Sequence, residues 1–416
     1  MKRLKVALVG VGGYGRTHVA CASQLSLSGQ VELVAFVEPR ENVAEAGALT
    51  AQGVKRYKDY RELFTKETDL DLVSIASPIH THVPIATEAF SRGVHVFLEK
   101  PPAVRIQDLR KLMELATKNQ CLCLVGFHDV IRKEILELKR RLLRGDIGKV
   151  QFVRMYALWR RTQTYYSRAS WAGRLFVNGD YVLDGPLNNS CAHLLNLGAF
   201  LSGKSLYEFA RPLSVQAELY RAAPVIEGED TSCLRAIMDS GVEVCIHVTQ
   251  AATRSHPRFV RIVGENGCAE YQDGDGVVFP QGRIDPNPQE KPTCMLLTAL
   301  VHYLQSGEGT LYMTLQNSEG FLLMSNGAYE SSGMIRRIPA EEISERADED
   351  GLGWSVRNLE EMMKHAALSG RLLSEVGVSW AEPSESFCLS NYGHFPTRWQ
   401  STCQEAEEKM TRLLEK

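Results

Sequence analysis

One lysine in this chain stands where a reactive side chain is expected. An apolar run at residues 94–98 is followed by Glu99, Lys100 and Pro101. Such a run predicts a buried strand, and the proline ends it because proline has no N–H for the ladder of hydrogen bonds. Lys100 then lies at the carboxyl end of a strand, where open α/β sheets bind their ligands. A solvated turn is the alternative for Glu99 and Lys100.

A glycine-rich run near the N-terminus predicts a dinucleotide site. The run Gly10-Val11-Gly12-Gly13-Tyr14-Gly15 directly follows an apolar stretch. The first glycine permits a tight turn, the second lets the backbone approach a pyrophosphate, and the last allows the next helix to pack closely. We therefore assign the candidate phosphate-binding residues as Gly10, Gly12, Gly13, Tyr14 and Gly15.

An acidic residue at the end of the second predicted strand favours NAD as the dinucleotide. Glu38 lies 23 residues after Gly15, where a carboxylate can accept hydrogen bonds from both ribose hydroxyls. Arg40 follows two residues later, and its guanidinium could meet a 2′-phosphate, so NADP stays open. A loop residue before Pro39 is the alternative reading of Glu38.

Alternating elements must position these side chains. Strand patterns occur at residues 5–10, 31–37, 72–76, 94–98 and 122–127, with a weaker one at 54–57. Helical periodicity fills the gaps at 14–24, 42–52, 60–64, 83–91 and 106–119. This alternation predicts an α/β domain at residues 1–128, a Rossmann dinucleotide-binding domain with a doubly wound parallel sheet.

The pattern changes after a helix predicted at residues 129–143. Period-two stretches at 150–156, 215–221, 231–238, 242–250 and 259–264 predict strands without intervening helices. Helices return at 294–305, 315–329 and 359–368, whereas 280–293 predicts a loop and the acidic stretch 341–350 a mobile surface segment. We expect residues 129–416 to form a C-terminal α+β domain with a large open, mostly antiparallel sheet.

Composition excludes several classes of protein. The 416 residues are 44% hydrophobic and 23% charged with a net charge of -3, and no run is long enough for a membrane helix. The interspersed charges offer no basic surface for nucleic acid. The ten cysteines form no Cys-x-x-Cys pair, which favours scattered thiols over a disulfide framework or a metal site. We expect a cytoplasmic protein without a structural metal.

Several further motifs occur in a fixed order along the chain. They are Ser77-Pro78-Ile79-His80-Thr81-His82, the stretch 93–101 that ends in Glu99-Lys100-Pro101, Val125-Gly126-Phe127-His128, Gly145-Asp146-Ile147-Gly148, Glu229-Asp230-Thr231 and the stretch 262–267. With the glycine run, they resemble the glucose-fructose oxidoreductase, inositol dehydrogenase and rhizopine-catabolism family, abbreviated Gfo/Idh/MocA. The resemblance covers most of the chain.

The resemblance implies roles for residues around the lysine. In family dehydrogenases the matching lysine contacts the substrate hydroxyl on the carbon that loses hydride, so Lys100 is the principal catalytic candidate. A cation there stabilises alkoxide character and can share in proton transfer. The resemblance also places Glu99, Ser77, Pro78 and His82 beside the cofactor, although His82 could instead cap the following helix. His128 stands where relatives commonly carry asparagine, and it could line the substrate crevice.

A second family element, Asp-x-x-x-His, matches this chain imperfectly. Aligning the segment 184–196 through its predicted helix pairs Asn189 with His193, so an asparagine replaces the acid. His193 could still remove the hydroxyl proton, and Asn189 could orient a neighbour without the charge of a carboxylate. An alternative register keeps Asp184 as the acid but puts Asn188 where the histidine belongs.

An aromatic and basic stretch precedes that helix. It contains Trp159-Arg160-Arg161, Tyr165-Tyr166 and Trp171. Stacking and bidentate hydrogen bonding by Trp159, Arg160 and Trp171 suit a sugar or an acidic polyol. Ordinary sheet packing with a solvated loop is the alternative.

The resemblance favours an NAD(P)-dependent oxidoreductase that acts on a sugar, a sugar derivative or a cyclic polyol. Some relatives keep NAD bound and use transient oxidation to cleave a glycosidic bond, which makes a glycosidase the second hypothesis. A dinucleotide-sensing regulator without enzymatic activity is the third. The resemblance further implies a homodimer or homotetramer that associates through the open face of the second sheet.

Overall fold

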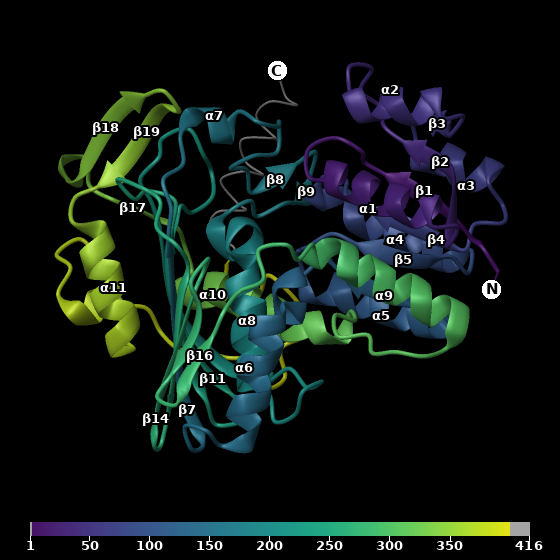
Figure 1. The fold of residues 1–416 in the computed structure, drawn as a ribbon. Coiled ribbons are helices and arrows are strands. Elements are labelled where there is room, and N and C mark those ends of the chain that lie inside the picture. Colours follow the sequence, from purple (N-terminus) through teal and green to yellow (C-terminus); the bar gives the residue numbers. More distant parts are fainter. Residues whose placement is uncertain (1, 400–416) are drawn as a thin grey trace, which may run out of the picture. The chain divides into compact units, whose positions relative to one another are not determined.

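The chain folds into two compact units in a computed structural model that describes residues 2–399 (Figure 1). Among the described residues, the first unit joins residues 2–132 to Gln289–Glu319, and the second joins Lys133–Pro288 to residues 320–399. The sequence predicts a first domain at residues 1–128 and a second at 129–416 with returning C-terminal helices. In the structure, residues 289–319 belong to the first unit.

A parallel sheet forms the centre of the first unit. Within residues 2–399 it has six strands in the order β3-β2-β1-β4-β5-β6. Their bounds are Leu4–Val9 (β1), Val31–Val37 (β2), Lys55–Tyr57 (β3), Leu72–Ile75 (β4), His95–Leu98 (β5) and Cys123–Val125 (β6). All neighbouring pairs are parallel, which confirms the predicted sheet. The strand order reverses between β1 and β4, the switch point at which such sheets bind ligands.

Amphipathic helices connect these strands. They are α1 (Gly15–Leu27), α2 (Ala44–Ala51), α3 (Tyr60–Lys66), α4 (His82–Ser91) and α5 (Ile106–Lys118). On α5 the buried residues recur at helical spacing, as Ile106, Leu109, Leu112 and Ala116. One apolar stripe of each such helix therefore packs onto the sheet, as the periodicity predicts.

A disulfide joins the returning segment to the first unit. Cys21 on α1 is bonded to Cys294 on α9 (Pro292–Ser306). The expectation of scattered thiols is wrong for this pair, because α9 returns 273 residues later to lie on α1. The other seven described cysteines fit the expectation: none of them forms a disulfide among residues 2–399, and five are buried. Cys403 lies outside the described residues.

A large mixed sheet forms the centre of the second unit. Within residues 2–399 it has ten strands, nine of them in the order β16-β15-β14-β13-β7-β12-β11-β10-β17, with β20 also paired to β10. Their bounds are Val150–Leu158 (β7), Pro212–Arg221 (β10), Thr231–Met238 (β11), Glu243–Thr249 (β12), Phe259–Gly264 (β13), Gly267–Gln272 (β14), Gly276–Phe279 (β15), Gly282–Ile284 (β16), Arg336–Arg337 (β17) and Phe387–Cys388 (β20). Only the β7–β12 and β10–β17 pairs are parallel among these strands, so the mostly antiparallel prediction is confirmed.

Helices of the second unit lie on both faces of this sheet. The helix α8 (Ala192–Ser202) packs on β7 and β12 from one side, and α11 (Leu359–Ser369) packs on the same strands from the other (Figure 1). The unit also contains α6 (Lys133–Arg144), the short α7 (Gln163–Tyr166) and α10 (Glu319–Ser332), together with a small hairpin of β8 (Phe176–Val177) and β9 (Asp180–Tyr181). The helix α11 thus covers part of the sheet face that the sequence predicts to be open.

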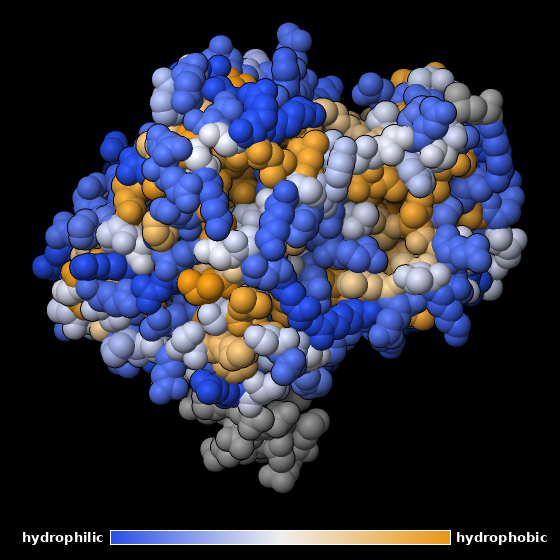
Figure 2. Space-filling view, turned by 90° about the horizontal axis from the view of Figure 1, so that it is seen from below, coloured by the Kyte–Doolittle hydropathy of each residue, from blue (hydrophilic) through white to orange (hydrophobic). Residues whose placement is uncertain are grey.

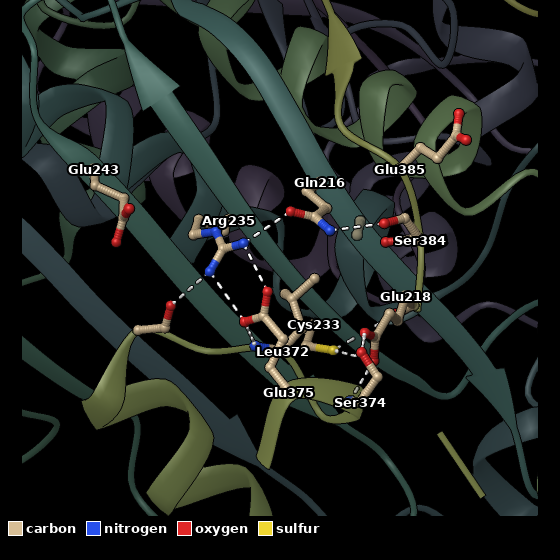
Figure 3. Close-up of polar contacts among 12 residues, drawn as sticks. Gln216, Glu218, Cys233, Arg235, Glu243, Leu372, Ser374, Glu375, Ser384 and Glu385 are labelled. Carbon is tan, nitrogen blue, oxygen red and sulfur yellow. Dashed lines mark hydrogen bonds and ion pairs between the residues drawn. The ribbon is translucent and has the colours of Figure 1, made fainter. Parts of the chain in front are cut away.

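Polar contacts hold the segment after α11 against the sheet (Figure 3). Arg235 on β11 pairs with both carboxylate oxygens of Glu375 at 2.9 and 3.0 Å and donates to Gln216 Oε1 at 2.8 Å. Beside it, buried Glu218 on β10 accepts a hydrogen bond from the backbone N–H of Ser374. These contacts fix the cover over β10 and β11.

The acidic stretch 341–350 is ordered. Its residues form β18 (Ile343–Asp348), which pairs antiparallel with β19 (Gly351–Val356). The prediction of a mobile segment is wrong because Trp354 on β19 is buried and its indole N–H donates to Glu345 at 2.9 Å. The acidic composition of residues 341–350 gave no indication of this hairpin.

The described part of the chain contains no helix that is long and apolar enough to cross a lipid bilayer. Hydrophilic residues make up much of the face drawn in Figure 2, and hydrophobic residues form separate patches between them.

Candidate functional site

The glycine turn leaves backbone donors open at the start of α1. Gly13 has a φ of +56°, and a Cβ added there would meet no atom within 4 Å. The backbone N–H groups of Gly12 and Gly13 have no acceptor among residues 2–399. Unpaired N–H groups at a helix N-terminus attract phosphate. The turn after β1 therefore fits the pyrophosphate of a dinucleotide.

Glu38 and Arg40 form a tight pair at the end of β2. The carboxylate of Glu38 is 2% exposed and accepts from Arg40 Nε at 2.9 Å and Nη2 at 3.0 Å. Burial alone would raise the pKa of Glu38, but the hydrogen bonds from Arg40 outweigh it and leave that pKa below its ordinary value. A Cβ on Gly12 would collide with the Arg40 guanidinium. Arg40 thus lies against Gly12 and holds Glu38 ionised beside it.

Histidine 82 ties together the loops after β4 and β5. Its Nδ1 lies 2.8 Å from the carbonyl oxygen of Pro101, and its Nε2 lies 2.9 Å from that of Ser77. The ring is 1% exposed, and burial lowers the pKa of His82, so the neutral ring donates to one of these carbonyls at a time. His82 therefore links the predicted cofactor loop Ser77-Pro78 to the backbone of Pro101.

Lys100 follows a carboxylate that is fixed from two sides. Glu99 Oε2 accepts from the backbone N–H of Lys100 at 3.1 Å, and His18 Nε2 lies 3.1 Å from Glu99 Oε1. Burial would raise the pKa of Glu99, but His18 and the charges of Lys100 and His128 keep it below its ordinary value. Glu99 therefore anchors the backbone of Lys100 at the carboxyl end of β5.

Sequence reasoning missed His18 and Ser74. Nδ1 of His18 lies 2.7 Å from Ser74 Oγ on β4, and both residues are buried. A chain of contacts therefore runs from Ser74 through His18 to Glu99. The available signal was His18 itself, a polar residue three positions after Gly15 on the face of α1 that packs on the sheet.

Tyr14 and His128 meet a residue of the returning helix. The two rings lie nearly parallel with centroids 6.5 Å apart, and Tyr14 Oη lies 2.9 Å from Thr293 Oγ1. Burial raises the pKa of Tyr14 to about 12, and burial lowers the pKa of His128. Tyr14 is therefore a protonated phenol at neutral pH. The sequence predicts both residues for the site, and Thr293, next to Cys294, was missed.

The second unit brings together the two residues that compete for the role of the family acid. Asn189 Nδ2 donates to Asp184 Oδ1 at 2.5 Å, and Asp184 Oδ2 accepts from Arg168 at 2.9 Å and from the N–H of Gly173 at 2.7 Å. Asn189 lies in a π-helical turn at Pro186–Ser190, and His193 follows in the first turn of α8. The carboxylate of Asp184 thus orients Asn189, whichever register is chosen.

The aromatic and basic stretch divides into two parts. Arg160 pairs with Asp348 at 3.0 Å and donates to the carbonyls of Arg346 and Gly351 at 3.3 Å. These contacts hold the β18–β19 hairpin, and a substrate contact by Arg160 stays a prediction. Trp159 and Trp171 are partly buried, each beside another arginine of the stretch.

Glu229, the first residue of the motif Glu229-Asp230-Thr231, is a further buried acid. Its Oε2 accepts from Tyr329 Oη at 2.6 Å, whereas its Oε1 has no partner among residues 2–399. Burial, above all, raises the pKa of Glu229 to about 8. A Cβ on Gly185 would overlap its carboxylate. Glu229 therefore lies directly behind the turn that carries Asp184 and Asn189.

Lys100 belongs to the first unit, and Asn189 and His193 belong to the second. Each unit thus arranges its own candidates, and a meeting of Lys100 with His193 stays a prediction.

Two sequence families match successive parts of the chain. Residues 4–127 match the oxidoreductase family with an NAD-binding Rossmann fold, and residues 135–270 match the GFO/IDH/MocA C-terminal domain.

Individual curated proteins match only part of this chain, and at low identity. Inositol 2-dehydrogenase of Salmonella typhimurium is 32% identical over 35% of this chain and 43% of its own length. An α-N-acetylgalactosaminidase of Shewanella oneidensis is 26% identical over 41% of this chain and 39% of its own. The chain spans about half the length of the curated relatives it matches, or less.

Solved structures match more of the fold. The WlbA dehydrogenase of Bordetella pertussis, in complex with NADH and UDP-GlcNAcA, superposes with a TM-score of 0.68 at 22% identity. That match covers 80% of this chain and 97% of the other. At this identity the likeness establishes the fold.

Proposed function

Because the chain belongs to the Gfo/Idh/MocA family of oxidoreductases, we propose that it is an NAD(P)-dependent dehydrogenase of a sugar, a sugar derivative or a cyclic polyol. One observation carries the proposal. In a single compact unit, Lys100 lies at the carboxyl end of β5 and the open glycine turn at the carboxyl end of β1, on either side of β4.

The chain's own residues divide the work. NAD, when bound, supplies the hydride acceptor. Gly12 and Gly13 hold the pyrophosphate with their N–H groups, and Glu38 holds the ribose. Lys100 stabilises the developing alkoxide of the substrate, and Glu99 fixes the backbone from which it extends. His193 exchanges the hydroxyl proton, and Asn189 positions it or the substrate.

The pairing of Glu38 with Arg40 supports NAD as the principal cofactor. The guanidinium of Arg40 already donates two hydrogen bonds to the carboxylate of Glu38. It would have to break them to bind a 2′-phosphate.

Isotope transfer tests the proposed reaction. The chain is incubated with NADH deuterated at the nicotinamide C4 and a panel of keto-sugars and inosose. We expect deuterium on the new carbinol carbon of at least one product. A panel without label in any product contradicts the proposal.

Replacing the lysine tests its role. Lys100→Met removes the cation and should lower kcat by about 10²- to 10⁴-fold. NADH binding, followed by fluorescence, should stay within about twofold because the glycine turn and Glu38 are untouched. Lys111→Met on the exposed face of α5 is the matched control and should keep full activity. Equal kcat for both variants would remove Lys100 from the mechanism.

The match to an α-N-acetylgalactosaminidase supports a second candidate, a glycosidase that acts through transient oxidation. Release of nitrophenol from a nitrophenyl glycoside without accumulation of NADH would favour it over the dehydrogenase.

We also propose a cytoplasmic homodimer or homotetramer. Phe152 on β7 and Val278 on β15 are 36% and 50% exposed, and strand register places them on the same face of the large sheet, which supports association there. Light scattering after gel filtration measures the oligomeric state.

A further inference from the structure

Two arginines alternate with aromatic rings just after β7. The guanidinium carbon of Arg161 lies 5.1 Å from the ring centre of Trp159 and 4.6 Å from that of Tyr165. The guanidinium carbon of Arg168 lies 3.8 Å from the ring centre of Tyr165 and 4.9 Å from that of Trp171. We call these five residues the arginine–aromatic cluster. All of them belong to the second unit, as do Asp184 and Asn189.

The two arginines differ in their partners. Arg168 pairs with Asp184 at 2.9 Å and donates to the carbonyl oxygen of Tyr165 at 2.9 Å. The guanidinium of Arg161 has no hydrogen bond or ion pair with any residue in the range 2–399, and its Nε is closed to solvent. A buried donor on a charged group is costly to leave unpaired. Arg161 therefore lacks an acceptor that its setting calls for.

The neighbouring acceptors are already used. Asp184 accepts from Arg168, Gly173 and Asn189. The side-chain oxygen of Gln250 accepts from Tyr166 Oη at 2.9 Å, and its amide donates to Ser190 Oγ at 2.8 Å. None of these groups pairs with the Arg161 guanidinium, so an acceptor on a ligand would complete its hydrogen bonds.

The backbone of Arg161 is held in place. Its N–H donates to the carbonyl oxygen of Gln250 at 2.9 Å, next to a bridge between Arg160 and Ala251. Its guanidinium is stacked between two rings, which limits how far it can swing. A fixed guanidinium loses little freedom when it binds a planar or tetrahedral oxyanion through two N–H groups.

We propose that Arg161 binds an oxyanion carried by the substrate, so that the substrate class is a sugar acid or a sugar phosphate rather than a neutral sugar. Tyr165 lies under the guanidinium groups of Arg161 and Arg168, whereas the partly exposed ring of Trp159 would pack against the C–H groups of the attached sugar. The proposal rests on the proposed function for the identity of the ligand as a sugar. It reassigns the substrate contact within the stretch from Arg160 to Arg161.

Calorimetric titration tests whether Arg161 binds an oxyanion, and it requires no catalytic turnover. The full chain with saturating NAD is titrated calorimetrically with glucuronate, galacturonate, glucose 6-phosphate and glucose, at up to about 10 mM. We expect at least one anionic probe to bind about tenfold or more tightly than glucose. The uronates and the phosphate distinguish a carboxylate from a phosphate as the bound group.

Variants assign the effect to Arg161. Arg161→Gln should abolish the preference for the anion, and Arg161→Lys should keep only part of it because lysine lacks the two-pronged geometry. The matched control is Arg174→Gln, an arginine of the same region that is half exposed and paired with Glu227. It should bind like the unaltered chain, and circular dichroism verifies that each variant is folded.

The outcomes separate the two proposals. Equal affinity for glucose and the anions, no binding of any anion, or a preference retained by Arg161→Gln overturns the role of Arg161. Because calorimetry does not depend on hydride transfer, an inactive chain that binds an anion through Arg161 would refute the dehydrogenase and leave this inference standing.

Discussion

Two buried glutamates, one in each unit, show how the surroundings of a carboxylate separate architecture from function. Glu218 is 0% exposed and accepts hydrogen bonds from the hydroxyl of Ser374 and the thiol of Cys233 (Figure 3). It also accepts a hydrogen bond from the hydroxyl of Tyr220. Glu99 is 6% exposed and accepts from His18 and from the N–H of Lys100.

The difference lies in the donors. The donors to Glu218 are hydroxyl, thiol and amide groups, and burial raises the pKa of Tyr220 and of Cys233, so both stay protonated and uncharged. These contacts join β10 to the segment after α11. The imidazole of His18 contacts Glu99, and the charges of Lys100 and His128 act on it. Buried carboxylates with cationic or imidazole neighbours are the ones to examine as parts of a site.

The largest expected effect follows from Glu218→Ala. The change removes the acceptor of four donors and leaves them buried, which should lower the free energy of unfolding by about 3 kcal/mol or more. Urea unfolding measures the loss. Glu385→Gln, an exposed acid near the same segment, is the control and should change stability by less than about 0.5 kcal/mol. Activity per folded molecule should be unaltered, and a loss of activity without a loss of stability would break the contrast with Glu99.

Glu229 sharpens the comparison because one of its oxygens has no partner among the described residues. Its pKa is raised from 4.5 to about 8, so the folded chain holds a proton that the unfolded chain has released between these pH values. Stability therefore falls as pH rises through this window, by about 1.4 kcal/mol per pH unit. Glu229→Gln cannot release a proton and should remove this fall.

Urea unfolding at pH 5, 6.5 and 8 measures how the free energy of unfolding changes with pH, for the unaltered chain and for Glu229→Gln. Glu227→Gln, an exposed neighbour paired with Arg174, should keep the slope of the unaltered chain. An identical slope for Glu229→Gln would show that Glu229 is ionised throughout.

The elements of the first unit were predictable because their signals are local. A period of two or 3.6 gave its strands and helices, and residues 94–101 marked Lys100 as a candidate whose catalytic role stays a prediction. Contacts made across the fold left no such signal. His18 reads as an ordinary helix residue until β4 and β5 are placed beside it, and Cys294 reads as a free thiol until α9 returns to α1.

The choice between adjacent arginines shows the same limit. Arg160 and Arg161 carry identical chemistry in the sequence, and only the position of the β18–β19 hairpin decides which of them is paired. That hairpin arises from an acidic stretch that composition assigned to a mobile segment.

The smallest expected effect concerns the contact between His18 and Glu99. His18→Leu leaves Glu99 without its side-chain donor, so the carboxylate can shift and move the backbone of Lys100. We expect kcat to fall by about tenfold while KM for NAD changes by less than about twofold, since the glycine turn is untouched. His18→Gln keeps an N–H donor and should recover most of the rate. If His18→Gln and His18→Leu lose the same activity, or if only KM for NAD changes, then His18 serves the packing of α1 and Glu99 resembles Glu218 after all.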